Sequence, residues 1–213
     1  MQITDGERIG EFVDRAWNAA TTGYPGPVHL SLPVDIMFSS FSEHAGNDER
    51  PWSRQTRPPP RAWPEPEALD KILEIINTAV RPVIIGGHGI WWSRSEHLLE
   101  AAGHELRIPV FNVPYHTKLL DESCDAYMGL ADFHQYHPSK DAIHEADVVI
   151  MIGGRLDNQM NFGNPPFFPK DTTLICVNGS PEELEYNFAA DEILLSDPGA
   201  FLQALQGLSL IHI

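Results

Sequence analysis

Four short polar runs in this 213-residue sequence each follow an apolar run typical of a buried strand, and their residue types suit a phosphate-bearing ligand. Glycine lets backbone amides approach an anion closely, and arginine can hold a phosphate through two parallel hydrogen bonds. Asparagine and aspartate can bond ribose hydroxyls. Together these residue types favour a nucleotide. The candidate binding residues are Gly86, Gly87, His88 and Gly89, then Arg155 and Leu156, then Asn178, Gly179 and Ser180, and finally Asp197.

The run that ends in Arg155 is central to this prediction. Residues 148–152 are apolar at every position, which is typical of a strand covered on both faces, as in a parallel sheet flanked by helices. Two glycines end the run, so Arg155 should lie at the carboxyl end of a parallel strand, where open α/β sheets bind ligands. A structural interpretation stays open, because two glycines after a strand are often a turn and an arginine beside Asp157 is often a surface ion pair.

Other kinds of site find less support. The run Gly86-Gly-His-Gly-Ile-Trp91 departs from the G-x-G-x-x-G fingerprint, which counts against an ordinary nicotinamide dehydrogenase. The sequence contains no Gly-x-Ser-x-Gly nucleophile elbow and no P-loop. Glu182 and Glu183 are adjacent carboxylates, and because neighbours on a regular element point apart, we expect both at the solvated surface.

A metal centre is not expected from the spacing of potential ligands. Cys124 and Cys176 are far apart in the sequence, which argues against a disulfide framework or a zinc site, and Cys176 lies in an apolar run typical of a core residue. His134, His137 and His144 have no paired carboxylate motif beside them, so we expect them to be solvated or hydrogen-bonded.

The first part of the chain predicts one helix and one strand. Apolar residues recur at helical spacing between about Gly6 and Thr22, and residues 28–32 alternate as a strand does. One helix and one strand cannot form a core by themselves. This segment therefore predicts the remnant of another α/β domain, with exposed apolar surface. Residues 38–66 are rich in Pro, Ser, Glu, Asn and Arg without an apolar period, and they predict a long linker.

From residue 67 onward strands and helices alternate. Strands are predicted near 82–85, 108–113, 148–152, 173–178 and 193–195, and helices near 69–76, 95–106, after Pro181, and over 198–205. A looser region at 114–138 precedes a short helix that ends at Glu145. Alternating β and α elements predict an α/β fold with a doubly wound parallel sheet of the Rossmann-like kind. The final residues 207–213 fit no preceding element, and we interpret them as a non-native tail.

The amino-acid composition limits the kinds of partner that this chain can bind. A formal net charge of -16 argues against nucleic acid or an anionic membrane surface, since both would be repelled. The first residues lack the basic and apolar regions of a signal peptide, and no apolar run is long enough to span a bilayer. These features predict a cytoplasmic protein that acts on small molecules.

Several segments resemble landmarks of one enzyme family. Residues 24–35 are similar to the closing strand of the pyrimidine-binding domain of thiamine-diphosphate-dependent enzymes, with a Gly-Pro-Val run and Pro33-Val-Asp35. Residues 81–89, 146–157 and 174–183 resemble successive landmarks of that family's central domain. The resemblance is greatest to the acetolactate synthase-like group, which includes 2-hydroxyacyl-CoA lyases and oxalyl-CoA decarboxylases.

This resemblance implies a domain plan and a function. Residues 1–37 would be the end of the pyrimidine-binding domain, 38–66 a linker, and 67–206 a central domain that binds ADP or FAD or has lost its nucleotide. Arg155 would be the family's arginine at this site, whereas Asn178 stands where relatives usually have an aspartate. The full-length enzyme would be a carbon–carbon lyase, decarboxylase or synthase acting on 2-keto acids or 2-hydroxyacyl-CoA, and a homodimer or homotetramer.

The same resemblance implies that the catalytic residues lie outside this sequence. The family's activating glutamate would come before Met1, and its Gly-Asp-Gly motif, which holds Mg²⁺ and thiamine diphosphate, would come after Ile213. We therefore predict no catalytic or metal-binding residue here and an inactive isolated chain. Two alternatives remain: an adenine-nucleotide-binding module without chemistry, and a spacer domain that binds no nucleotide.

Overall fold

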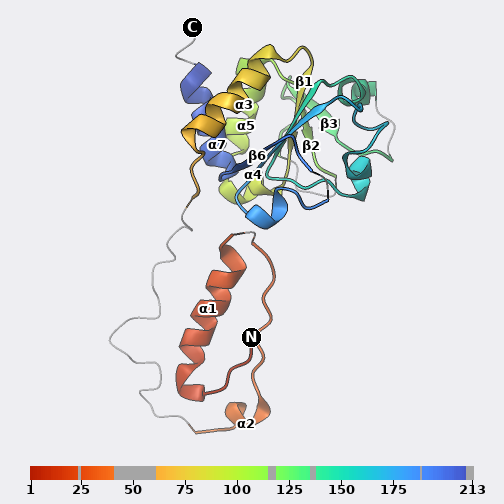
Figure 1. The fold of residues 1–213 in the computed structure, drawn as a ribbon. Coiled ribbons are helices and arrows are strands. Elements are labelled where there is room, and N and C mark those ends of the chain that lie inside the picture. Colours follow the sequence, from red (N-terminus) through yellow and green to blue (C-terminus); the bar gives the residue numbers. More distant parts are fainter. Residues whose placement is uncertain (24, 41–60, 115–118, 135–137, 188, 210–213) are drawn as a thin grey trace. The chain divides into compact units, whose positions relative to one another are not determined.

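The computed structural model describes residues 1–23, 25–40, 61–114, 119–134, 138–187 and 189–209, with the backbone only for 207–209. The chain divides into two compact units, Met1–Pro60 and Arg61–Ile213 (Figure 1). Most of the predicted linker, residues 41–60, lies outside the described residues.

The first unit contains the predicted helix. A 3-10 turn, η1 (Gly6–Arg8), leads into α1 (Ile9–Thr21), and a short helix that the sequence pattern missed, α2 (Val34–Met37), follows later. The strand predicted at 28–32 is wrong as a regular strand, because its backbone forms only an isolated bridge between Gln2 and Ser31. A strand needs a neighbour of similar length to form a ladder, and the segment that pairs here is only three residues long.

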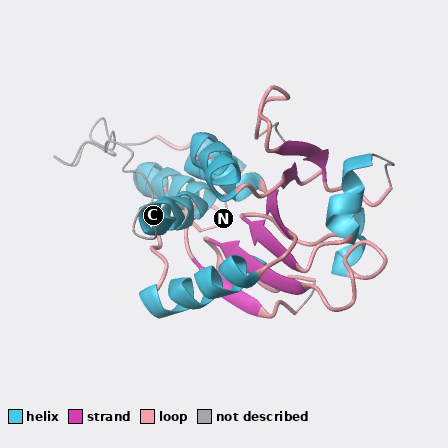
Figure 2. Ribbon diagram, turned by 90° about the horizontal axis from the view of Figure 1, so that it is seen from above, coloured by secondary structure: helices cyan, strands magenta, loops and turns pink. Residues whose placement is uncertain are grey.

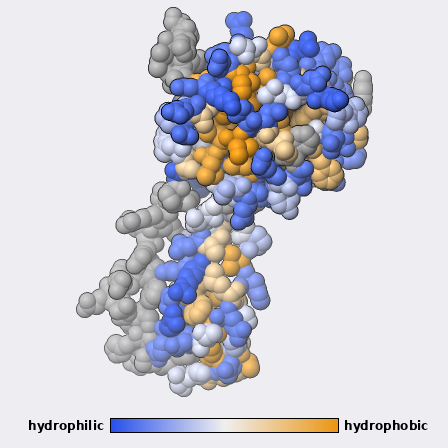
Figure 3. Space-filling model, in the orientation of Figure 1, coloured by the Kyte–Doolittle hydropathy of each residue, from blue (hydrophilic) through white to orange (hydrophobic). Residues whose placement is uncertain are grey.

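Helix α1 leaves its apolar side uncovered within this unit. None of its residues is buried, and Val13 and Trp17 are 48% and 56% exposed. Figure 3 shows hydrophobic residues at the surface of this unit beside hydrophilic ones. The prediction of exposed apolar surface is therefore confirmed.

The second unit contains a six-stranded, wholly parallel sheet. Its strands lie in the order β3-β2-β1-β4-β5-β6. This order reverses between β1 and β4, which makes their carboxyl ends the topological switch point at which doubly wound sheets bind ligands. The predicted α/β fold is confirmed. The strands are β1 (Pro82–Gly86), β2 (Val110–Asn112), β3 (Tyr127–Leu130), β4 (Val148–Ile152), β5 (Thr173–Asn178) and β6 (Glu192–Leu195).

Helices and loops cover both faces of this sheet (Figures 1 and 2). On one face, α3 (Pro66–Thr78), α5 (Glu96–Leu106) and α7 (Pro198–Ser209) bury apolar side chains such as Ile72, Leu99 and Phe201 against the strands. On the other face, α6 (Asp141–His144) and the long β4–β5 connection contribute Ile143 and Phe167 to a second core. Central strands are buried on both sides, which explains why β4 is apolar at every position.

Several elements of this unit differ from the sequence prediction, and among them is the short helix after β1, where a loop was expected. Strand β3 was missed because Gly129, with φ of +108°, interrupts a segment that has no apolar alternation. The helix predicted after Pro181 is only the 3-10 turn η4 (Pro181–Glu183). Helix α7 continues to Ser209 and so enters the segment that the sequence suggested is a tail. The remaining short elements are α4 (His88–Ser93), η2 (Pro138–Lys140) and η3 (Asn158–Gly163).

Candidate functional site

The structure brings the predicted binding runs to one edge of the sheet. The runs follow β1, β4, β5 and β6, whose carboxyl ends meet there. Gly86 is the last residue of β1 and pairs with both Asn112 and Ile152, so the backbone after β1 lies directly beside the backbone after β4. This arrangement places the runs where the sequence predicted a ligand.

The backbone amides of the first run are engaged within the protein. The N–H of Gly87 donates to the carbonyl of Ile152 at 2.8 Å, and the N–H of Gly89 donates to the carbonyl of Gly153 at 2.8 Å. An anion would have to replace these bonds. The two glycines therefore join the β1 and β4 loops instead of presenting their N–H groups to a ligand.

Close packing explains why Gly87 is glycine. A Cβ at this position would lie 2.3 Å from the Cα of Gly154 and 2.5 Å from the carbonyl oxygen of Gly153. A Cβ on Gly89 would lie 2.8 Å from the Cα of Gly153. Contacts this short do not occur between real atoms, so the loops can touch only because neither residue has a side chain.

Arg155 is held by an acidic side chain of the same chain. Its Nε donates to one carboxylate oxygen of Glu183 at 2.7 Å and its Nη2 to the other at 2.6 Å. The guanidinium carbon also lies 4.5 Å from the centre of the Tyr186 ring. The Arg155 side chain is 34% exposed, whereas Glu183 is 8% exposed. Two parallel bonds of this kind are the geometry in which arginine would otherwise hold a phosphate.

This pairing corrects two expectations. Glu183 was expected at the solvated surface, but the turn η4 directs it inward toward the β4 loop, and only Glu182 is exposed. Arg155 was expected to pair, in the structural interpretation, with Asp157. Asp157 instead caps η3 by accepting the N–H of Gln159 at 2.9 Å.

A small pocket lies beside the guanidinium of Arg155. Its lining includes Leu156, Cys176 and Asn187, and it has room for about one water molecule. Leu156 is 5% exposed and its carbonyl accepts the side-chain amide of Asn187 at 2.5 Å, so this residue belongs to the core. The pocket is too small for a nucleotide.

His88 is the titratable residue in the predicted binding run after β1. It opens α4 and is partly buried. Burial lowers its pKa, and the positive charge of Arg155 lowers it further. The imidazole therefore stays neutral at neutral pH.

We expect Arg155→Ala to raise the pKa of His88 in an NMR titration, because the change removes a nearby positive charge. Because the pKa of His88 is lower in the folded chain than in the unfolded chain, the unfolded chain binds the proton at a higher pH. The free energy of unfolding should therefore fall as the pH falls through the ordinary histidine range. Arg107→Ala is a matched control, because Arg107 ends α5 at the opposite edge of the sheet. A His88 pKa that is identical in the parent and in Arg155→Ala would contradict this account.

The third run is also engaged within the fold. Asn178 is 5% exposed; its amide nitrogen donates to the carbonyl of Gly154 at 3.3 Å, and its oxygen accepts the N–H of Ser180 at 3.1 Å. Its side chain thus joins the β4 and β5 loops. Gly179 packs loosely, since a Cβ there would meet nothing nearer than 3.9 Å.

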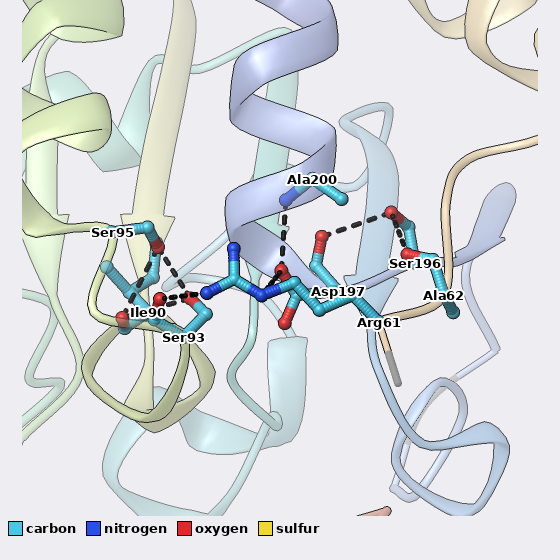
Figure 4. Close-up of polar contacts among 8 residues, drawn as sticks. All are labelled: Arg61, Ala62, Ile90, Ser93, Ser95, Ser196, Asp197 and Ala200. Carbon is cyan, nitrogen blue, oxygen red and sulfur yellow. Dashed lines mark hydrogen bonds and ion pairs between the residues drawn. The ribbon is translucent and has the colours of Figure 1, made fainter. Parts of the chain in front are cut away.

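Asp197 caps the final helix. Its Oδ1 accepts the N–H of Ala200 at 3.0 Å at the start of α7 and lies 3.9 Å from Nε of Arg61 (Figure 4). The N–H of Asp197 donates to the carbonyl of Ala62, and Arg61 also donates to the carbonyl of Ser93 at 3.1 Å. Asp197 and Arg61 together therefore fasten the segment before α3 to α4 and α7.

Sequence reasoning missed the two partners that decide this edge, Glu183 and Arg61. Glu183 comes from the connection after β5, a run that had already been singled out, and meets Arg155 after the neighbouring strand β4. Arg61 comes from the segment before α3 and meets Asp197 after β6, far away in the sequence. The missing signal was the short turn after Pro181, because a helix there would have pointed its carboxylates elsewhere.

Helices in the described part of the chain are all too short or too polar to cross a lipid bilayer.

Comparison with models of protein families matches residues 69–205 to the thiamine pyrophosphate enzyme central domain. Among curated relatives, a probable acetolactate synthase large subunit of Methanocaldococcus jannaschii is 29% identical over 209 residues, which cover 96% of this chain and 34% of the relative. The 2-hydroxyacyl-CoA lyase 1 of Dictyostelium discoideum is 27% identical over 176 residues, which cover 83% of this chain and 29% of the relative. The chain spans about a third of the length of these relatives.

Solved structures share the fold. A thiamine diphosphate-dependent 4-hydroxybenzoylformate decarboxylase of Rhodococcus jostii RHA1 superposes with a TM-score of 0.78 at 17% identity, covering 98% of this chain and 38% of that chain. A benzoylformate decarboxylase from Polynucleobacter necessarius gives a TM-score of 0.76 at 23% identity, with the same coverage.

Proposed function

Because the chain belongs to the thiamine pyrophosphate enzyme family, whose central domain matches its residues 69–205, we propose that it is part of an enzyme that makes or breaks a carbon–carbon bond beside a carbonyl. The relatives are named as acetolactate synthases and 2-hydroxyacyl-CoA lyases. The substrate class that fits both names is a 2-keto acid or a 2-hydroxyacyl-CoA thioester.

Thiamine diphosphate and Mg²⁺ would bind to parts of this enzyme outside residues 1–213. The sequence contains no Gly-Asp-Gly run, the motif that the family resemblance assigns to the diphosphate and its metal. When bound, thiamine diphosphate supplies a carbon nucleophile and an electron sink. The role left to residues 61–213 is to support the catalytic parts and fix their spacing.

The observation that carries this scaffold role is the pair between Arg155 and Glu183. The cation that would hold a nucleotide phosphate already makes two bonds to a carboxylate that is 8% exposed. The N–H groups of Gly87 and Gly89 are likewise bonded to the β4 loop. These bonds support the scaffold role over ADP or FAD binding at this edge, and the adjoining pocket, which has room for about one water, supports it as well.

A second candidate function is binding of ADP or FAD at the same edge, with a phosphate displacing Glu183. It is favoured by the position of Arg155 at the switch point and by the 34% exposure of its side chain. Asn178 and Asp197 also lie at this edge. The two candidates differ in whether Arg155 keeps its carboxylate partner.

Calorimetric titration of ADP and FAD into the chain separates the candidates. We expect no binding heat up to about 1 mM nucleotide, which corresponds to a binding free energy weaker than about -4 kcal/mol. Arg155→Ala is the matched variant, because it removes the guanidinium that lies after β4, at the switch point, and that could pair with a phosphate through two bonds. Binding in the parent that Arg155→Ala abolishes would establish the second candidate, and binding that survives it would contradict both.

The proposal also covers the cellular location, the oligomeric state and the partners of the full enzyme. It would be cytoplasmic, a homodimer or homotetramer, without nucleic-acid or membrane partners. The net charge of -16 supports the absence of partners rich in phosphate. The exposed Val13 and Trp17 on α1 support association, since neighbouring protein would cover such an apolar face.

A further inference from the structure

A group of three potential metal ligands lies at the edge of the sheet opposite the candidate nucleotide site. Glu100 and His104 are on α5, and Cys124 is in the connection between β2 and β3. Helix α5 runs back from the carboxyl ends of the strands, so its last turns lie near the amino ends of β2 and β3. The group is therefore separate from Arg155 and its partners.

The ligand atoms are close enough to share one ion. The Sγ of Cys124 lies 3.8 Å from Nε2 of His104, and all three ligand atoms lie within 4.8 Å of one another. Two ligands on a tetrahedral zinc ion, with bonds of about 2.3 Å to sulfur and about 2.0 Å to nitrogen, are about 3.6 Å apart. The sulfur and nitrogen already have nearly this separation. Glu100 is exposed, so a change of rotamer can move its carboxylate by the remaining distance of about 1 Å.

Helix geometry and close packing position these three residues. Glu100 and His104 are four residues apart on α5 and so lie on the same face of the helix. Next to His104, Gly103 lets the helix approach the other segment closely, because a Cβ there would lie 2.8 Å from the Cβ of Ala126. The backbone of Cys124 is fixed at both ends, since its N–H donates to Asp121 and its carbonyl accepts the N–H of Tyr127.

We propose that Glu100, His104 and Cys124 bind a zinc ion. Zinc is borderline-soft and accepts a thiolate, an imidazole and a carboxylate in one tetrahedral set, which few other ions do as well. The three protein ligands leave a fourth position for water. Cys124 is 5% exposed, and the exposed side chains of Glu100 and His104 give the ion access from solvent.

Zinc at this site fastens the last turns of α5 to the β2–β3 connection. A ligand that binds only the folded state stabilises it by RT ln(1 + L/Kd), where L is the free ligand concentration, so the temperature of unfolding rises with the logarithm of the zinc concentration once the site is saturated. The role that we propose for this site is to stabilise the fold, with water as the fourth ligand. Its ligands come from a helix and a distant connection, so the linear spacing of cysteines and histidines, which argued against zinc, could not reveal it.

Cobalt(II) substitution tests the proposal on the untagged 213-residue chain. We expect one cobalt ion per chain, with a thiolate-to-cobalt charge-transfer band and the strong visible absorption of tetrahedral coordination. Zinc should displace the cobalt and raise the temperature of unfolding. Cys124→Ala should remove the charge-transfer band, and Glu100→Gln and His104→Gln should each weaken zinc binding at least about tenfold, since even outer-shell partners have effects of this size.

Three matched variants serve as controls. Cys176→Ala removes the other cysteine, and His97→Gln and Glu105→Gln change exposed residues elsewhere on α5. All three should keep the band and the affinity, and circular dichroism identifies any variant that does not fold. The proposal is overturned if the parent chain shows no charge-transfer band, or if the band survives Cys124→Ala, or if His97→Gln weakens binding as much as His104→Gln.

Discussion

Gly87→Ala should lower the free energy of unfolding of this chain by about 3 kcal/mol, the upper end of the usual cost of overpacking. The added methyl group would lie 2.3 Å from the Cα of Gly154 and 2.5 Å from the carbonyl oxygen of Gly153. Both contacts are with backbone, so no side chain can rotate away. Relief requires the β1 and β4 loops to separate, and this breaks the bond from the N–H of Gly87 to the carbonyl of Ile152.

Urea denaturation followed by far-ultraviolet circular dichroism measures this change. Gly179→Ala is the matched control, because it adds the same methyl group at the same edge of the sheet where nothing lies nearer than 3.9 Å. It should change the free energy of unfolding by no more than about 0.5 kcal/mol. Equal stabilities for Gly87→Ala and Gly179→Ala would show that the two loops do not pack as closely as described.

The fold could be predicted from the sequence because central strands of a parallel sheet have a strong signature. Residues 148–152 and 174–177 are apolar without alternation, and each is followed by glycine or a polar run. The family resemblance drawn from these landmarks is confirmed by the match over residues 69–205. Edge strand β3 lacks that signature, because Gly129 interrupts it and its residues are partly exposed.

The position of the candidate site could be predicted from the sequence, but the bonding partners of its residues could not. The ends of β1, β4 and β5 could be located from the sequence, and Arg155 does lie at this edge. What each polar group bonds to depends on the path of the chain between elements. Glu183 reaches Arg155 because a turn of three residues directs it there. The N–H of Gly87 is bonded because two loops about 65 residues apart are in contact. Neither the turn nor the contact has a local sequence pattern.

The 213-residue chain, supplied with thiamine diphosphate and Mg²⁺, should show no turnover of pyruvate, benzoylformate or a 2-hydroxyacyl-CoA thioester above the background without protein. A complete protein in which this chain is joined to the proposed catalytic parts should accelerate one of these reactions by at least about 10⁶-fold, the lower range of enzymatic rate enhancement. The difference is this large because the groups that would activate the cofactor are proposed to lie outside residues 1–213.

Turnover by the chain alone is therefore the most direct test of its assignment as a non-catalytic central part of a thiamine-diphosphate-dependent enzyme. The measurement compares product formation by equal molar amounts of the 213-residue chain and the complete protein, each with and without thiamine diphosphate. The assignment predicts cofactor-dependent product from the complete protein only. Cofactor-dependent product from the 213-residue chain would contradict it.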